Sequence, residues 1–148
     1  MKKITKILAL LFILSFTTMS LSAQVTTPRP NEVSREGQGG GSVITKDKGM
    51  TIINTTTLAD DIEGYAGPTP VKIYINKSQK IEKVEALKNL ETPKYWALIK
   101  RDLLNKWNGL AVKKAATQQV DVITGATYSS EAVIENVRRG LDYYKKKQ

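Results

Sequence analysis

The chain has 148 residues and a formal net charge of +9, and it contains neither cysteine nor histidine. Its length is sufficient for one domain with its own hydrophobic core. The two missing residue types exclude disulfide bonds, thiolate nucleophiles, iron–sulfur clusters, Ser–His or Cys–His catalysis, histidine-ligated haem and an ordinary zinc site. The chain is therefore either a binding or structural module, or it takes its chemistry from an organic cofactor.

The first 23 residues have the pattern of a secretory signal peptide. Lys2, Lys3 and Lys6 precede an apolar run from Ile7 to Phe16, and Ala23 is a small residue at the expected cleavage point. The apolar run is shorter than the roughly 20 residues that a membrane-spanning helix needs. We therefore expect an exported protein, periplasmic or secreted, that acts at the outer face of the cytoplasmic membrane or beyond it.

Cleavage would remove three lysines and no acidic residue, which lowers the net charge from +9 to +6. Acidic proteins and anionic surfaces suit such a charge. Export, together with the lack of an aromatic and basic RNA-binding signature, predicts no nucleic-acid partner. The basic residues are scattered along the sequence, and the run Lys145, Lys146 and Lys147 is typical of a solvated helix end.

Residues 24–48 are expected to form a flexible linker, and residues 49–148 a folded domain. Pro28, Pro30 and the glycine-rich run 37–41 interrupt any periodicity in the linker. The mostly β-branched residues 50–57 then predict the first strand.

A hairpin is expected in the middle of the chain. Residues 58–62 form either a helical turn or an extension of the first strand, and a loop with two glycines and two prolines follows at 64–70. Apolar and polar residues alternate over 71–75, which predicts a strand with one buried face. Residues 81–87 return as its partner, and their broken alternation near Lys83 and Val84 suggests a β-bulge.

Two main helices are expected in the second half of the chain. Thr92 is the expected N-cap of the first, with Pro93 at its first position and Asn108–Gly109 at its end. Residues 120–123 predict a short strand, and Ser129 or Ser130 is expected to cap the last helix. The predicted fold is α+β, a small, mostly antiparallel sheet packed with two helices. The expected core residues are Trp96, Ile99, Leu103 and Trp107 in the first helix and Val133, Val137, Leu141 and Tyr144 in the second.

A strand, a glycine turn and a helix N-terminus follow one another in residues 121–130. Three interpretations are open from the residues alone. Gly125 turns the chain and the hydroxyls cap the helix, or the free N–H groups bind a phosphate, or a group is covalently attached at Thr127. Hydrolysis with Thr127 as the nucleophile is disfavoured, because the chain has no histidine base and Thr127 is not at a free N-terminus.

The sequence Asp121-x-x-Thr124-Gly125-Ala126-Thr127 resembles the flavinylation motif of the FMN-binding domain family. That family includes the flavin-carrying subunits of the Rnf complex and of the sodium-pumping NADH:quinone oxidoreductase. The resemblance implies a phosphoester bond between FMN and Thr127. A separate exported FAD:protein FMN transferase makes this bond in the family, using FAD and a divalent metal.

Two further segments resemble the family and occur in the family's order. One is the glycine-rich segment around Tyr65, and the other is the Glu-Thr-Pro segment at Glu91, which in the family lies against the flavin. The resemblance spans about residues 50–144, with Lys94 as a departure where many relatives have glycine. It implies a cofactor-binding set of Gly64, Tyr65, Gly67, Glu91, Thr92, Asp121, Thr124, Gly125, Ala126, Tyr128 and Ser129 in addition to Thr127, with no catalytic residue and no resident metal.

Four of these residues have open roles. Glu91 and Thr92 either contact the isoalloxazine ring or the ribityl chain, or serve only as an acidic residue and a cap at the start of the helix. Asp121 either serves the transferase reaction, by metal binding or by aiding deprotonation of Thr127, or accepts hydrogen bonds from turn amides. Tyr65 either stacks near the flavin ring or packs in the core. Trp96 and Trp107 are expected in the core.

The resemblance implies an exported flavoprotein that carries FMN and passes electrons between membrane or extracytoplasmic redox proteins. The lack of a further membrane helix indicates a stand-alone carrier and not a subunit of an ion pump. Two alternatives are a flavin-free binding or structural module of the same fold and an FMN-dependent reductase of a small acceptor.

Overall fold

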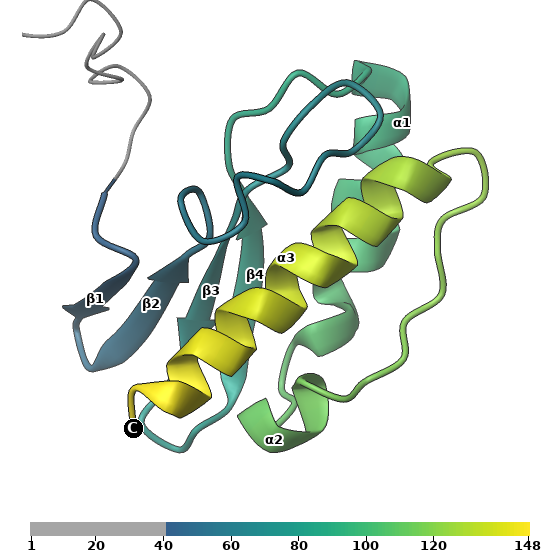
Figure 1. The fold of residues 1–148 in the computed structure, drawn as a ribbon. Coiled ribbons are helices and arrows are strands. Elements are labelled where there is room, and N and C mark those ends of the chain that lie inside the picture. Colours follow the sequence, from purple (N-terminus) through teal and green to yellow (C-terminus); the bar gives the residue numbers. More distant parts are fainter. Residues whose placement is uncertain (1–40) are drawn as a thin grey trace, which may run out of the picture. The chain divides into compact units, whose positions relative to one another are not determined.

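The computed structural model describes residues 41–148, so the predicted signal peptide and most of the predicted linker lie outside the described residues (Figure 1). The described residues form a four-stranded antiparallel sheet in the order β1-β2-β3-β4, with helices packed on one face. This is the predicted α+β fold. The strands are β1 (Ile44–Asp47), β2 (Met50–Asn54), β3 (Val71–Ile75) and β4 (Ile81–Ala86), and the helical elements are α1 (Pro93–Leu98), the π-helix η1 (Ile99–Leu103), the 3-10 helix η2 (Leu104–Trp107), α2 (Val112–Ala115) and α3 (Thr127–Lys146).

Strand β1 lies within the segment that was expected to be a linker. It pairs antiparallel with β2, so that Ile44 lies opposite the fully buried Ile53. The turn between the two strands has positive φ at Lys48 (47°) and Gly49 (80°), which matches the right-handed twist of a two-stranded hairpin. The folded part therefore begins earlier than residue 49, because these few residues extend the sheet by one edge strand.

The central hairpin agrees with its sequence pattern. Val71, Ile73 and Ile75 of β3 are fully buried, as their alternation predicted. In β4, Lys83 pairs with Tyr74 but Ile81 pairs with Ile75, so one residue between them has no partner. The predicted irregularity near Lys83 is confirmed, and it keeps apolar residues on the inner face on both sides of the bulge.

The predicted first helix runs from Pro93 to Trp107 but changes its type along the way. Thr92 occupies the N-cap position without a side-chain cap, although its carbonyl accepts the N–H of Trp96 at 2.9 Å. The wider turns of η1 follow α1, and the tighter turns of η2 end the run. The expected core residues of this run, Trp96, Ile99, Leu103 and Trp107, are all buried.

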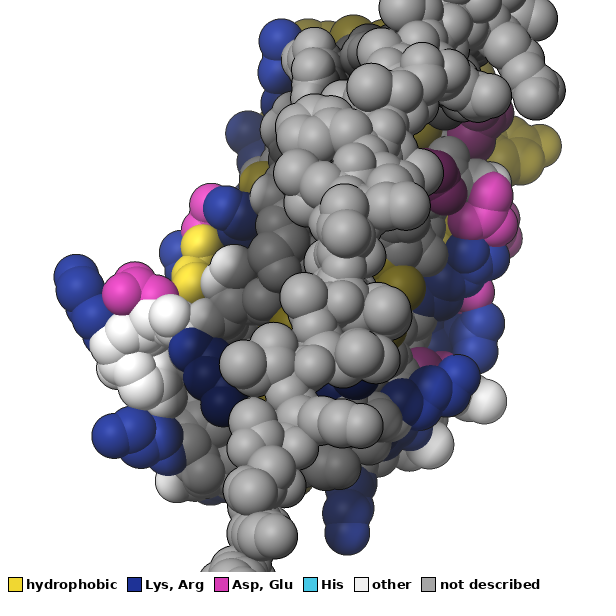
Figure 2. All heavy atoms as spheres, turned by 60° about the vertical axis from the view of Figure 1, so that its left-hand side comes forward, with side chains coloured by type: hydrophobic (Ala, Val, Ile, Leu, Met, Phe, Trp, Pro, Cys, Tyr) yellow, Lys and Arg dark blue, Asp and Glu magenta, His cyan; other side chains and the backbone are white. Residues whose placement is uncertain are grey.

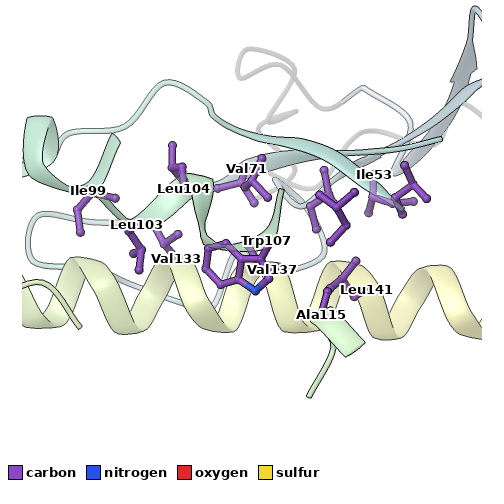
Figure 3. Packing of buried hydrophobic residues seen from close by; sticks show 14 of the residues in the cluster. Ile53, Val71, Ile99, Leu103, Leu104, Trp107, Ala115, Val133, Val137 and Leu141 are labelled. Atoms are coloured by element: carbon purple, nitrogen blue, oxygen red, sulfur yellow. The ribbon is translucent and has the colours of Figure 1, made fainter. Parts of the chain in front are cut away.

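Helix α3 packs along the inner face of the sheet (Figure 3). All four residues of its predicted apolar stripe are buried. Gly140 allows the closest approach, because a Cβ atom at this position would lie 2.6 Å from Cδ1 of Ile73. Small size at this one position therefore sets the distance between α3 and β3.

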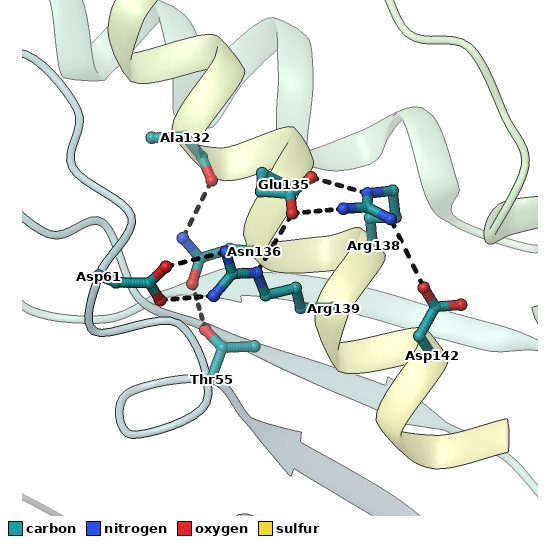
Figure 4. A network of polar contacts seen from close by, with 8 residues as sticks. All are labelled: Thr55, Asp61, Ala132, Glu135, Asn136, Arg138, Arg139 and Asp142. Atoms are coloured by element: carbon teal, nitrogen blue, oxygen red, sulfur yellow. Dashed lines mark hydrogen bonds and ion pairs between the residues drawn. The ribbon is translucent and has the colours of Figure 1, made fainter. Parts of the chain in front are cut away.

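Polar contacts also hold α3 to the segment that follows β2 (Figure 4). Thr55 donates its hydroxyl to Oδ1 of the fully buried Asn136 at 2.6 Å and accepts the N–H of Val71 at 2.9 Å. Arg139 contacts both oxygens of Asp61 and one oxygen of Glu135. The segment after β2 makes a helical turn, since the carbonyl of Thr55 accepts two successive N–H groups, so the alternative of a strand extension is wrong.

The predicted strand at residues 120–123 is wrong. This segment has no regular secondary structure, and the N–H of Ile123 is donated to the hydroxyl of Ser130 at 3.0 Å. Its Val120 and Ile123 pack against the core from a loop, which explains their apolar character. The short helix α2 was not predicted. No helix among the described residues has the length and apolar character needed to cross a membrane.

Candidate functional site

Three segments meet at one end of the fold and enclose an open cavity of about 270 Å³. The first is the loop between Glu63 and Pro68. The second comprises Glu91 and the start of α1, and the third is the turn that leads into α3. The cavity is lined by Tyr65 from the loop, by Glu91, Thr92 and Tyr95, and by Gly125, Ala126, Thr127, Tyr128 and Ser129.

The loop of the first segment is a small hairpin with its aromatic side chain in solvent. Glu63 and Pro68 form an antiparallel bridge, and the N–H of Gly64 bonds to the carbonyl of Gly67 at 2.8 Å. Gly67 has a φ of 134°, which few residues other than glycine adopt. Tyr65 is 73% exposed at the tip of the loop, so it lies at the cavity and not in the core.

Glu91 fastens the loop to α3. Its side chain is buried, its Oε1 accepts the N–H of Ala66 at 3.0 Å, and its Oε2 accepts the hydroxyl of Ser129. A Cβ atom on Gly64 would lie 2.5 Å from Oε1, so only glycine permits this approach. A single buried carboxylate therefore connects all three segments around the cavity.

The turn before α3 places backbone N–H groups without hydrogen-bond partners beside the cavity. Gly125 has a φ of 85°, and an added Cβ would lie 3.7 Å from the ring of Tyr95. Helix α3 begins at Thr127 and has no side-chain cap. The N–H groups of Thr127, Tyr128 and Ser129 therefore remain without an intrahelical or capping partner, beside the cavity that these residues line.

The predicted capping role of Ser129 or Ser130 is wrong, because both residues lie inside the first turn of α3. The hydroxyl of Ser129 is donated to Glu91. The hydroxyl of Ser130 is donated to the carbonyl of Ala126 at 2.8 Å and accepts the N–H of Ile123. The two serines stabilise the corner from within and leave the helix terminus open.

Aromatic side chains surround the cavity. Tyr65, Tyr95 and Tyr128 are 73%, 40% and 68% exposed. In the described part of the chain, the other exposed large hydrophobic residues are Leu90, directly before Glu91, and Val122, in the loop that precedes α3. Tyr95 was not predicted as a site residue. Its position directly before the core residue Trp96 was the available signal, because it turns the Tyr95 side chain away from the apolar stripe.

No lysine or arginine lines the cavity. Lys94, the departure noted in the sequence, points its Nζ over the ring of Tyr95 at 5.8 Å and lies outside the lining. Among the described residues, no group of three or more acidic side chains is placed to hold a metal ion. A negatively charged ligand group in the cavity would therefore be stabilised by the N-terminus of α3 and its N–H groups.

The structure brings eight of the predicted cofactor-binding residues to this cavity: Tyr65, Glu91, Thr92, Gly125, Ala126, Thr127, Tyr128 and Ser129. Gly64 and Gly67 do not line it but shape the loop that carries Tyr65. Asp121 and Thr124 are exposed residues of the preceding loop and do not line the cavity.

Residues 64–142 match the FMN-binding domain family. No curated protein and no solved structure matches the chain significantly. The matched part covers 79 residues, from 64 to 142 inclusive, which is more than half of the 148 residues. The chain therefore belongs to the FMN-binding domain family, and FMN is the cofactor that this domain indicates.

The chemistry of the cavity fits this cofactor. Unpaired N–H groups at a helix N-terminus suit the phosphate of FMN, and the exposed tyrosine rings suit a flat aromatic system. The volume of about 270 Å³ is slightly below the roughly 300–1,000 Å³ typical of ligand pockets. The cavity can therefore enclose only part of a molecule as large as FMN.

Proposed function

We propose that this protein is an exported flavoprotein that carries FMN on Thr127 through a phosphoester bond and transfers electrons between redox partners outside the cytoplasm. The observation that carries the proposal is which hydroxyl groups at the start of α3 form hydrogen bonds and which do not. Thr127 is exposed, lines the cavity and has no side-chain hydrogen bond among the described residues, whereas Ser129 and Ser130 use theirs.

Attachment at Thr127 is compatible with its surroundings. A phosphodiester keeps one negative charge, and the uncapped start of α3 stabilises an anion at this place. Gly125 and Ala126 present little side-chain volume, so the backbone can approach the phosphate closely. Thr124 is also exposed but does not line the cavity, which makes it the poorer acceptor.

The attachment step needs a second enzyme, for which an exported FAD:protein FMN transferase is the proposed partner. The hydroxyl oxygen of Thr127 would form a bond to the FMN phosphorus of FAD, and the bond from that phosphorus to AMP would break. AMP leaves with the electron pair, and the hydroxyl proton passes to a base. Asp121 precedes this corner in the chain and is exposed, so it is available to the transferase complex as that base or as a ligand of its divalent metal.

A carrier function is supported by the openness of the site. Flavin supplies the redox chemistry. The small cavity leaves part of the cofactor beyond the protein surface, within reach of a redox partner. Glu91 is the one carboxylate of the lining, and it already accepts two hydrogen bonds, so the cavity offers no acid–base pair for turnover of a substrate.

Intact-mass measurement after co-expression with a FAD:protein FMN transferase tests the attachment. We expect a mass increase of one FMN minus water in the wild-type chain and in Thr127→Ser, and none in Thr127→Ala. Thr117→Ala is the matched control, because Thr117 is also exposed but lies outside the cavity, and it should gain the full increment. An unmodified wild-type chain, or a modified Thr127→Ala variant, would contradict covalent attachment at this residue.

Two further measurements test the other parts of the proposal. Export predicts that the mature chain recovered outside the cytoplasm begins directly after Ala23. Electron transfer predicts that the chemically reduced flavoprotein is reoxidised by a second extracytoplasmic redox protein faster than by buffer alone. A chain that keeps its first 23 residues in the cytoplasm would overturn the export step without affecting flavin binding.

A further inference from the structure

Lysines from four separate segments gather at the end of the fold that lies away from the cavity. We call this surface the lysine end. It comprises Lys46 and Lys48 at the β1–β2 turn, Lys77 and Lys80 at the β3–β4 turn, Lys113 and Lys114 in α2, and Lys145, Lys146 and Lys147 at the end of α3.

Contacts to the β3–β4 turn hold these segments together. A Cβ atom on Gly49 of the β1–β2 turn would lie 2.5 Å from Cε of Lys77. The first N–H of α2, that of Val112, is donated to the carbonyl of Gln79 at 2.9 Å. The side-chain Nε2 of Gln79 donates a hydrogen bond to the side-chain Oε1 of Gln148 at 3.0 Å. The lysine end is therefore one surface and not a set of scattered charges.

Helix α3 separates the lysine end from the cavity. It begins at the cavity with Thr127 and ends among the lysines after 20 residues, a length of about 30 Å. In Figure 1 the C-terminus and α2 lie together at the end of α3 that is remote from α1. A partner or surface that binds the lysine end would therefore not cover the cavity.

Lysines outnumber acidic residues at the lysine end by nine to three. Among its nine lysines, Lys145 pairs with Asp142 at 2.8 Å, and no other has an acidic side chain within ion-pair distance in the described part of the chain. Three acidic residues lie in or beside the segments that form it, namely Asp47, Asp142 and Glu82, which accepts a hydrogen bond from Asn76 of the β3–β4 turn. Figure 2, in which the lysine end stays at the bottom, shows many Lys and Arg side chains and few acidic ones in its lower half.

We propose that the lysine end binds an anionic lipid surface and holds the protein there with its cavity directed away from the lipid. All nine residues are lysine, and lysine is a hydrated point charge on a flexible stem that does not require a fixed partner geometry. A layer of anionic headgroups supplies many such partners at once. Nucleic-acid surfaces favour arginine forks and exposed aromatic platforms, but the exposed aromatics of the described residues lie at the cavity.

A shallow cavity within the lysine end offers a place for one headgroup phosphate. It has a volume of about 270 Å³ and lies between Lys46 and Lys77, with Thr51 and Tyr144 also in its lining. Both lysines line this cavity, and neither has an ion-pair partner among the described residues, so both charges are available to an anion bound there. This proposal does not depend on the flavin.

Sedimentation of the full chain with lipid vesicles tests the proposal. The protein should bind vesicles that contain phosphatidylglycerol, and binding should weaken steeply as salt is added. It should not bind vesicles made only of zwitterionic phosphatidylcholine. The triple variant Lys77→Gln, Lys80→Gln, Lys146→Gln should bind about a hundredfold more weakly at low salt, since each lysine near an anionic surface contributes about fivefold.

A matched triple variant separates the lysine end from net charge. Lys72→Gln, Lys88→Gln, Lys100→Gln removes the same three charges from exposed or half-exposed positions elsewhere, and its binding should change less than fivefold. All variants share the remaining sequence, so any contribution from the first 40 residues cancels. Equal losses in both triple variants, salt-independent binding, or binding of a DNA duplex in place of vesicles would overturn the proposal.

Discussion

Ser129 and Glu91, 38 residues apart in the chain, meet through a hydrogen bond from the serine hydroxyl to the carboxylate. The other oxygen of Glu91 accepts the N–H of Ala66 at 3.0 Å. The carboxylate is buried and has no basic partner within ion-pair distance in the described residues, so its hydrogen bonds alone hold it in place. The geometry of the cavity therefore depends on two contacts of one side chain.

Replacing Glu91 should loosen the cavity in proportion to the contacts that are lost. Glu91→Ala leaves the N–H of Ala66 and the hydroxyl of Ser129 without their acceptor, and we expect a stability loss of about 1–3 kcal/mol. Glu91→Gln can still bond to both groups and should lose less than about 1.5 kcal/mol. Urea unfolding measures the stability, and intact mass after flavinylation measures the site. Equal behaviour of the two variants would show that Glu91 has no positioning role.

Gly64→Ala tests the same contact from the other side. The added methyl group would lie 2.5 Å from Oε1 of Glu91, so the loop or the carboxylate must move. We expect a loss of about 1–3 kcal/mol and slower flavinylation. Gly109→Ala is the comparison, since Gly109 has a φ of 78° and open space around an added Cβ. It should lower stability through backbone strain but leave flavinylation unchanged.

Gly140→Ala should destabilise the protein although alanine favours helices. The gain in helix propensity is about 1 kcal/mol, whereas the new Cβ would lie 2.6 Å from Cδ1 of Ile73 and 3.2 Å from Cγ2 of Thr55. Overpacking of this kind costs about 1–3 kcal/mol. Ile73→Val removes the Cδ1 atom, so the double variant should lose less than the sum of the two single losses. Strict additivity in this double-mutant cycle would rule out the contact.

Acid should weaken the attachment of α3 to the segment after β2. The hydrogen bond from Arg139 holds the pKa of Asp61 below its ordinary value, and hydrogen bonds from Arg138 and then Arg139 lower the pKa of Glu135. Folded-state pKa values below the unfolded ones mean that the stabilisation is complete above about pH 4–5 and is lost as the pH falls further.

Arg139→Gln provides the check on this pH dependence. The variant lacks the partner of Asp61 and one partner of Glu135, so its stability should change less than that of the wild type between about pH 2 and pH 4. Urea midpoints across this range measure the difference. Parallel curves for the two proteins would show that the ion pairs contribute nothing in solution, as is common for exposed pairs.

The regular parts of the fold were predictable because burial imposes a clear pattern on them. The alternation in β3 and the apolar stripe of α3 each face one continuous core, and the structure confirms both. Strand β1 was missed because only its first residue, Ile44, packs against the core and the others are exposed. The strand predicted at 120–123 was wrong because Val120 and Ile123 are half-buried against the core from a loop, and a β-branched apolar run in such a loop resembles a strand.

The cavity was predictable from its motif but its internal connections were not. The glycine turn before Thr127 is visible in the sequence. The pairing of Glu91 with Ser129 is a contact between distant segments, which no local pattern encodes. The lysine end escaped notice for the same reason, because its residues come from four segments that only the tertiary fold brings together.

The order of the strands along the sheet is also their order in the chain, so the sheet is built from neighbouring segments, which pair quickly during folding. Helix α3 joins it through contacts as distant as that of Asn136 with Thr55, 81 residues earlier. We expect the cavity, which needs the start of α3, to assemble last. A transferase that acts only on the assembled cavity would then modify only chains that have finished folding. The flavin content of a sample would then measure the fraction of its chains that have reached the native fold.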